Sequence, residues 1–285
     1  MNRRTWLLSL LLATSLGAAP SYEEALSLFN QRKDAEAEAA FRALAAENPR
    51  HVNALIHLGR LAMRARKTDD ALRHFQSAVE LEPNNSVALG ELGGAYGSKA
   101  QNAGLIEKAS LAGKSRKAME RAVELDPNNA DARSGLVQFY AQAPSMMGGG
   151  MDKAHAQADA LIKLDAARGR AAKADLFVRE KKYDAAFVLY DEAVKANPAD
   201  YSSLYALGRL AAETGRNLDR GLETLRRCLE LAPGQNQPTH AAAQWRIGNI
   251  LEKKGDRAAA KAAYQASLAL DPGFTQAQTA LRKLS

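Results

Sequence analysis

The segment VNALIHLGRLAMRARKTDDALRHFQSAVELEP, residues 52–83, decides the fold. Its first half places apolar and small residues at helical spacing, a polar turn follows, and a second helical stripe runs up to Pro83. Proline ends such a stripe because it cannot continue the hydrogen-bond ladder of a helix. Pro49 precedes Pro83 by 34 residues, and a period of this length predicts helical hairpins stacked into a solenoid.

Small residues should let the two helices of this hairpin touch. Leu58 and Gly59 fall on one face of the first helix, and Ala71 and Phe75 on one face of the second. We expect Gly59 and Ala71 to permit close approach, while Phe75 fills the space beside them.

The pattern recurs with the same phase and resembles the tetratricopeptide repeat. Leu or Ile followed by Gly, with a later proline, returns at Leu92-Gly93 with Pro127, Leu207-Gly208 with Pro233, and Ile247-Gly248 with Pro272. The resemblance implies an all-α, right-handed α-solenoid of stacked antiparallel helix hairpins, with about seven repeats and a C-terminal capping helix over 275–284. It also implies a protein that binds partners and is not an enzyme.

The solenoid should occupy residues 20–285, with insertions near 97–113, 143–151 and 234–238. Pro127 lies 44 residues after Pro83, so ten extra residues lie between or extend the helices of the third repeat. We expect the insertions to be loops on the rim of the solenoid and not domain boundaries.

Residues 1–19 follow a different pattern, that of a secretory signal peptide. Two arginines precede a short apolar run and a small-residue end, Gly17-Ala18-Ala19. The run is about half of the roughly 20 residues that a membrane-spanning helix needs, although an uncleaved anchor is an alternative. The sequence therefore predicts a bacterial periplasmic or secreted protein without a stable transmembrane span after cleavage.

Charge and cysteine content limit the partners and the chemistry. Removing Arg3 and Arg4 leaves 37 basic and 32 acidic residues, a net charge of +5, and no dense Lys/Arg run argues for nucleic acid. The single cysteine, Cys228, excludes an intramolecular disulfide and should be a small buried residue. No zinc, nucleophile-elbow or phosphate-loop motif is present, so we expect no catalytic residue, no metal and no cofactor.

Met146, Met147 and Met151 surround three glycines in the second insertion. We interpret this segment as a rim loop whose methionines contact a partner or fold back on the array. The alternative is a soft-metal or small-molecule binding protein, in which these thioethers and His155 hold an ion such as copper(I).

The family resemblance implies that outward residues of the first helices contact extended peptides. Carried onto this chain, that phase selects His57, Arg60, Arg64, Arg168, Arg179, Tyr205, Arg209, Trp245, Arg246 and Asn249. Arginine forks bind carboxylates and aromatic rings supply contact area, so a protein or peptide partner with acidic groups would suit this set. We therefore expect a non-catalytic envelope scaffold whose oligomeric state the sequence leaves open.

Overall fold

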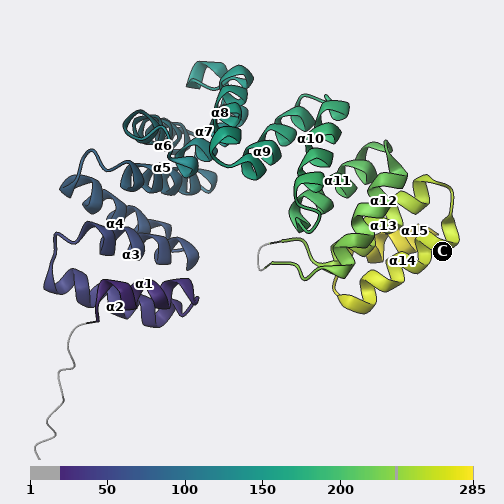
Figure 1. Ribbon diagram of the computed structural model, residues 1–285, viewed down its shortest axis with the longest axis horizontal. Coiled ribbons are helices and arrows are strands. Elements are labelled where there is room, and N and C mark those ends of the chain that lie inside the picture. The colour runs from purple at the N-terminus through teal and green to yellow at the C-terminus, as the bar shows by residue number, and fades with distance from the viewer. Residues whose placement is uncertain (1–19, 235–236, 285) are drawn as a thin grey trace, which may run out of the picture. The chain divides into compact units, whose positions relative to one another are not determined.

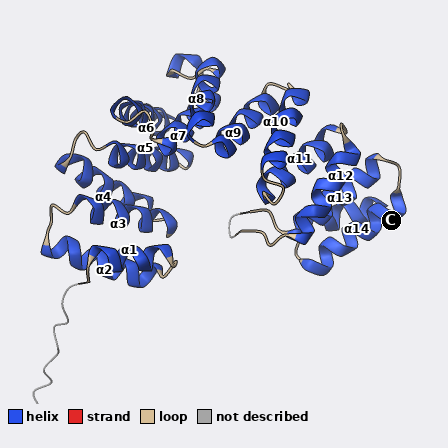
Figure 2. Cartoon of the chain, viewed as in Figure 1, coloured by secondary structure: helices blue, strands red, loops and turns tan. Residues whose placement is uncertain are grey.

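The computed structural model describes residues 20–234 and 237–284, in which helices are joined by short turns and loops and no strand is present (Figure 1; Figure 2). The elements are α1 (Tyr22–Asn30), α2 (Asp34–Glu47), α3 (Val52–Arg64), α4 (Thr68–Leu81), α5 (Ser86–Gln101), α6 (Leu105–Leu125), α7 (Ala130–Gln142), the 3-10 helix η1 (Ser145–Met147), α8 (Met151–Leu164), α9 (Ala166–Arg179), α10 (Tyr183–Ala196), α11 (Tyr201–Thr214), α12 (Leu218–Glu230), α13 (His240–Lys253), α14 (Arg257–Leu270) and α15 (Thr275–Leu284). The predicted all-α repeat solenoid is confirmed.

The hairpins fall into two compact units. Unit 1 ends at Leu125 and contains three hairpins, α1/α2 to α5/α6; unit 2 begins at Asp126 and contains four, α7/α8 to α13/α14, and then α15. Within each unit, the second helix of a hairpin packs against the first helix of the next hairpin. The core is therefore a series of layers between neighbouring hairpins.

A left-handed residue makes the turn inside several hairpins. Arg32, Arg66 and Lys181 have φ of 60°, 59° and 60°, in the left-handed region that residues other than Gly rarely adopt. In the second hairpin the amide of Lys67, just after Arg66, donates to the carbonyl of Ala62 at 2.8 Å. This gives a hydrogen-bond partner to a carbonyl in the last turn of α3. The polar turn expected from the sequence is thus a short helix cap, and α4 begins directly after it.

Glycine contacts in the first helices explain the Leu-Gly pattern. A Cβ at Gly59 would lie 2.3 Å from Cε1 of the fully buried Phe75, and one at Gly248 would lie 2.3 Å from Cε1 of Tyr264. The prediction that Gly59 makes room for Phe75 is therefore confirmed. Cys228 is also buried as expected, and burial raises the pKa of its thiol to about 12.

The ten extra residues of the third repeat lengthen helices. α5 continues to Gln101 and α6 starts at Leu105, so the extra residues extend the helices, one of the two possibilities that the sequence allowed, and the expectation of a rim loop near 97–113 is wrong. Ser115 shows why the lengthened α6 holds to α5: its hydroxyl donates to the carbonyl of Gly93 at 2.7 Å, and Leu111 is buried one turn earlier. The segment is also rich in Lys, Ala and Leu, which favour helices.

The remaining expectations vary in outcome. The 143–151 segment separates α7 from α8, and the closing helix α15 spans 275–284 as expected. The predicted signal peptide lies outside the described residues, as do residues 235 and 236 of the last insertion. Within the part of the chain that the structure describes, no helix is long and apolar enough to span a membrane.

Candidate functional site

A groove of about 500 Å³ lies in unit 2 between α9 and α11. It contains three of the residues selected as partner contacts, Arg168, Tyr205 and Arg209. We call it the α9–α11 groove, and its lining is Asp165, Ala167, Arg168, Ala171, Asp175, Tyr190, Asp200, Ser202, Ser203, Tyr205, Ala206, Arg209, Gln237 and Pro238. Its volume lies in the range of natural ligand sites.

Both arginines of the groove already face carboxylates. Arg168 pairs with Asp131 of α7 at 2.7 Å, and Arg209 lies 3.7 Å from Asp175 of α9. Asp175 also accepts a hydrogen bond of 2.6 Å from the Tyr190 hydroxyl. Burial, followed by the charge of Asp175, raises the pKa of Tyr190, so its hydroxyl remains a donor at neutral pH.

The lining is not positively charged. Two arginines, 168 and 209, stand against three aspartates, 165, 175 and 200, and two minus three gives a net charge of −1. Two of these aspartates are N-caps: Asp165 accepts from the amide of Arg168, and Asp200 from that of Ser202. The lining therefore offers charges of both signs together with hydroxyl groups.

Tyr205 forms an aromatic part of the wall. It packs on Tyr201, with ring centroids 6.5 Å apart and planes 6° from parallel. Burial raises the pKa of Tyr201 to about 12, and its hydroxyl donates to the carbonyl of Pro238 at 2.7 Å. Gln237 adds a bond from Nε2 to Oγ of Ser202 at 2.9 Å. Gln237 and Pro238 of the 234–238 insertion thus form part of the groove lining.

Sequence reasoning missed most of these polar groups. Asp175, Ser202 and Gln237 sit outside the helix phase from which the contacts were chosen. The insertion at 234–238 was a signal that could have been used, because an insertion next to a first helix can build a groove wall.

In unit 1, Arg60 and Arg64 of α3 are both held by acidic side chains. Arg60 pairs with Glu91 of α5 at 2.6 Å, and Arg64 pairs with Asp34 of α2 at 2.8 Å. The Arg64 guanidinium also lies 3.7 Å from the centroid of the Phe29 ring. These two residues are therefore tied to their neighbouring hairpins and do not lie in the α9–α11 groove.

The outward placement expected for His57 is wrong. Its side chain is 7% exposed, stacks on Phe41 at 4.8 Å and meets the Phe29 ring edge-on at 5.0 Å. Nδ1 donates to the carbonyl of Asn53 at 2.9 Å. The first hairpin places these rings over α3, so a position that would face solvent in an isolated repeat is part of the core here.

His57 should make unit 1 sensitive to acid. Burial is the main cause that lowers the pKa of His57, and the charges of Arg60 and Arg64 lower it further. The neutral ring is thus favoured in the folded state, so stability should hold above the unfolded pKa of about 6.5 and fall as pH drops below it. We expect His57→Gln to flatten this fall in urea unfolding monitored by circular dichroism.

His74 contributes in the same direction, since burial lowers its pKa as well. The variant His57→Gln/His74→Gln should therefore show a weaker dependence than either single variant. A wild-type slope between pH 7 and 5 that persists in the double variant would exclude these two rings as its source.

In the last full repeat, the three selected residues make contacts within unit 2. Arg246 pairs with Glu213 at 2.9 Å, Trp245 packs on Phe274 with centroids 5.9 Å apart, and Asn249 accepts from the hydroxyl of Tyr264 at 2.9 Å. Arg179, by contrast, is exposed at the end of α9. Neither Arg179 nor the last-repeat group lines the α9–α11 groove.

The sequence matches the tetratricopeptide repeat over residues 22–86, 171–236 and 241–274. These segments make up more than half of the chain. The chain belongs to the tetratricopeptide repeat family. Proteins built from these repeats bind protein or peptide partners and are generally non-catalytic scaffolds. No curated protein matches the sequence.

Solved structures share the fold of this tetratricopeptide repeat protein at low sequence identity. A tetratricopeptide repeat protein from Parabacteroides merdae is 16% identical, with a TM-score of 0.62, over 92% of this chain and 96% of that one. PilW, a widely conserved type IV pilus biogenesis factor, is 15% identical, with a TM-score of 0.62, over 81% and 98%. PilF of Pseudomonas aeruginosa is 16% identical, with a TM-score of 0.59, over 81% and 97%.

Ion pairs between successive first helices recur in this tetratricopeptide repeat protein. Each joins an arginine to an acidic residue 31–37 positions away, at Arg60–Glu91, Asp131–Arg168, Asp175–Arg209 and Glu213–Arg246. Such half-exposed pairs contribute about 0–1 kcal/mol each to stability. Their larger effect is on the arginines, which the sequence analysis treated as free cations: each guanidinium charge is balanced by a carboxylate.

The Met/Gly segment is an ordered turn. A Cβ at Gly149 would lie 1.8 Å from the carbonyl oxygen of Ala143, so the chain can pass there because glycine lacks that atom. Met146 is 93% exposed, and the amide of Gly150 donates to the backbone carbonyl of Tyr140 at 2.9 Å. Partner contact by Met146, Met147 and Met151 stays a prediction.

The soft-metal alternative requires His155 to bind a metal ion, but its ring contacts a carboxylate. Its Nε2 lies 2.9 Å from Oε2 of Glu180, a contact that is the main cause lowering the pKa of Glu180. In the described ranges, no group of three or more His, Cys, Asp or Glu side chains could hold a metal ion.

Proposed function

We propose that this tetratricopeptide repeat protein is an exported, non-catalytic scaffold that holds a protein or peptide partner of the cell envelope in the α9–α11 groove. The observation that carries the proposal is that Arg168, Tyr205 and Arg209, chosen from the sequence as contacts, line one groove. Side chains fixed by ion pairs and ring packing lose little freedom on binding. A preformed groove therefore binds an extended segment at a low entropic cost.

The chemistry of the lining indicates a polar segment with an isolated acidic group. Arg168 is held at 2.7 Å by Asp131, whereas Arg209 is 3.7 Å from Asp175 and so has the looser partner. A carboxylate of the partner can engage Arg209 while Tyr205 contacts an apolar side chain. A strongly acidic partner suits the groove less well, because the lining carries a net charge of −1.

Export is part of the proposal, and the pattern of residues 1–19 supports it. N-terminal sequencing of the protein from a periplasmic fraction tests it. We expect a mature chain that begins near residue 19 or 20; material that is confined to the cytosol and starts at Met1 would contradict export.

Blocking the groove should abolish partner recovery. Ala206 lies in the lining on α11 and is partly buried, and Ala206→Arg would fill the groove with a long side chain. In affinity capture from cross-linked envelope extract, we expect this variant to lower recovery of the partner about tenfold or more, and Arg209→Ala to lower it less.

Arg179→Ala is the matched control, because Arg179 is an exposed arginine on α9 that does not line the groove. It should capture the partner as the wild type does. Equal recovery by wild type, Ala206→Arg and Arg209→Ala, with unchanged circular dichroism, would rule out the groove as the binding site.

A further inference from the structure

The start of α6 is exposed on all sides. Each residue from Leu105 to Ser110 is exposed, and the aliphatic side chains of Leu105 and Ile106 are 86% and 89% exposed. This part of α6 lies in the 97–113 segment, near which the third repeat exceeds the period by ten residues. Two neighbouring large apolar side chains at the free end of a helix are unusual for a surface that binds nothing.

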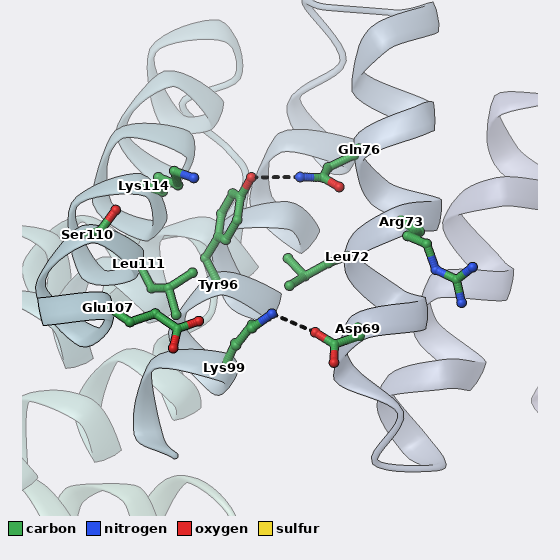
Figure 3. A pocket seen from close by; sticks show the side chains of 10 residues that line it. All are labelled: Asp69, Leu72, Arg73, Gln76, Tyr96, Lys99, Glu107, Ser110, Leu111 and Lys114. Atoms are coloured by element: carbon green, nitrogen blue, oxygen red, sulfur yellow. Dashed lines mark hydrogen bonds and ion pairs between the residues drawn. The ribbon is translucent and has the colours of Figure 1, made fainter. Parts of the chain in front are cut away.

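Beside this end lies a cavity of about 400 Å³, whose ten lining residues Figure 3 labels. We call it the α4–α6 groove. Its floor is apolar: Leu72 of α4 and Leu111 of α6 are buried, and the ring of Tyr96 lies between the side chains of the two helices. Tyr96 is fixed by a hydrogen bond of 3.0 Å from Nε2 of Gln76. The groove can therefore receive an apolar side chain.

The charged side chains that line the α4–α6 groove are three basic ones, Arg73, Lys99 and Lys114, and two acidic ones, Asp69 and Glu107, so three minus two gives a net charge of +1. Lys99 pairs with Asp69 at 2.7 Å, but Lys114 has no ion pair within the described residues, and its ammonium lies 5.6 Å from the centroid of the Tyr96 ring. From Lys99 to Lys117 the chain carries five basic residues and one acidic residue, Glu107, a net charge of five minus one, or +4. This stretch thus holds much of the positive charge of a chain whose formal total is +7.

We propose that the α4–α6 groove and the exposed start of α6 form a second docking surface, which binds an acidic, amphipathic segment of a partner protein. Apolar side chains of the segment would lie over Leu72, Leu111 and Ile106, and its carboxylates would face Lys114 and Lys117. Charge complementarity selects an acidic segment over a basic one. This surface is in unit 1 and involves second helices, so it is separate from the α9–α11 groove of unit 2.

A protein segment fits this surface better than an anionic membrane does. Leu72 and Leu111 of the floor are buried, so a flat lipid surface does not reach them, and the carboxylates of Asp69 and Glu107 in the lining would face anionic headgroups. A peptide can place an apolar side chain on the floor and a neutral group beside Glu107.

The test uses two short synthetic helical peptides with the same Leu/Ala face, one flanked by Glu and the other by Lys. Fluorescence anisotropy with the full mature chain should show binding of the Glu peptide, and little binding of the Lys peptide. We expect Lys114→Glu/Lys117→Glu to weaken the Glu peptide about tenfold or more, and Leu105→Asp/Ile106→Asp to do the same. These four side chains are exposed, so the variants should fold normally.

Two controls make the outcome specific. Val188→Asp introduces one aspartate at another exposed aliphatic residue, in unit 2, and should leave binding unchanged; so should Ala206→Arg, which blocks the α9–α11 groove. Failure of the Glu peptide to bind, or equal binding by wild type and both α6 variants, would overturn the proposal. Co-sedimentation with phosphatidylglycerol vesicles that is lost in the α6 variants, without peptide binding, would assign the surface to the membrane instead.

Discussion

Replacing Phe75 with alanine should lower the free energy of unfolding of unit 1 by about 3–5 kcal/mol. The ring is fully buried between α3 and α4, with the backbone of Gly59 directly against it. Removing it leaves a cavity that neighbouring side chains cannot fill, because they are held by their own helices. Urea unfolding of the full chain, followed by circular dichroism, measures the loss.

Val87→Ala is the control for Phe75→Ala. Val87 lies on α5 in the same unit, and its side chain is 45% exposed, so removing its methyl groups should change stability by no more than about 0.5 kcal/mol. If both variants unfolded at the same urea concentration as the wild type, Phe75 could not be the residue that joins the two helices of this hairpin.

Replacing Gly93 with valine should separate α5 from α6 and cost about 1–3 kcal/mol. A Cβ at this position would lie 2.5 Å from Cγ of Met119 and 3.1 Å from the backbone oxygen of Ser115. Met119 can move, but the backbone of α6 cannot move without disturbing the buried Ser115 hydroxyl, which donates to the carbonyl of Gly93 at 2.7 Å. Thermal unfolding should therefore show a lower midpoint.

The next residue provides an opposite control. Gly94 is exposed on the same helix, and a Cβ there would have no atom within 4 Å. Gly94→Ala should thus stabilise unit 1 by about 0.5–1 kcal/mol, the usual gain of alanine over glycine inside a helix. Destabilisation by both substitutions would mean that the close approach of α5 and α6 is not what requires glycine at position 93.

The architecture could be predicted from the sequence because its signals are local and repeated. Each hairpin needs a small residue where its helices cross and a bulky residue beside it, so Gly59 with Phe75 and Gly248 with Tyr264 leave the same pattern. The periodic prolines mark helix ends. Repetition of one weak pattern across several repeats is enough to indicate the fold.

The surfaces could be predicted less well, because they depend on pairs of distant side chains. Whether Arg209 is a free cation depends on Asp175, and whether His57 faces solvent depends on rings of the preceding hairpin. Helical spacing indicates on which face of a helix a residue lies, but it does not indicate which side chains of neighbouring repeats cover that face. The start of α6 was missed for a related reason, since a sequence insertion reads as a loop until its packing is known.

The most direct test of the central claim is site-specific photo-cross-linking in intact cells, with the photoreactive residue at position 206 in the α9–α11 groove or at position 179 outside it. The proposed function predicts a cross-linked partner from position 206 that is absent from position 179 and is weakened by Arg209→Ala. Cross-linking of the same proteins from both positions, or none from position 206, would contradict the claim that this groove holds the partner.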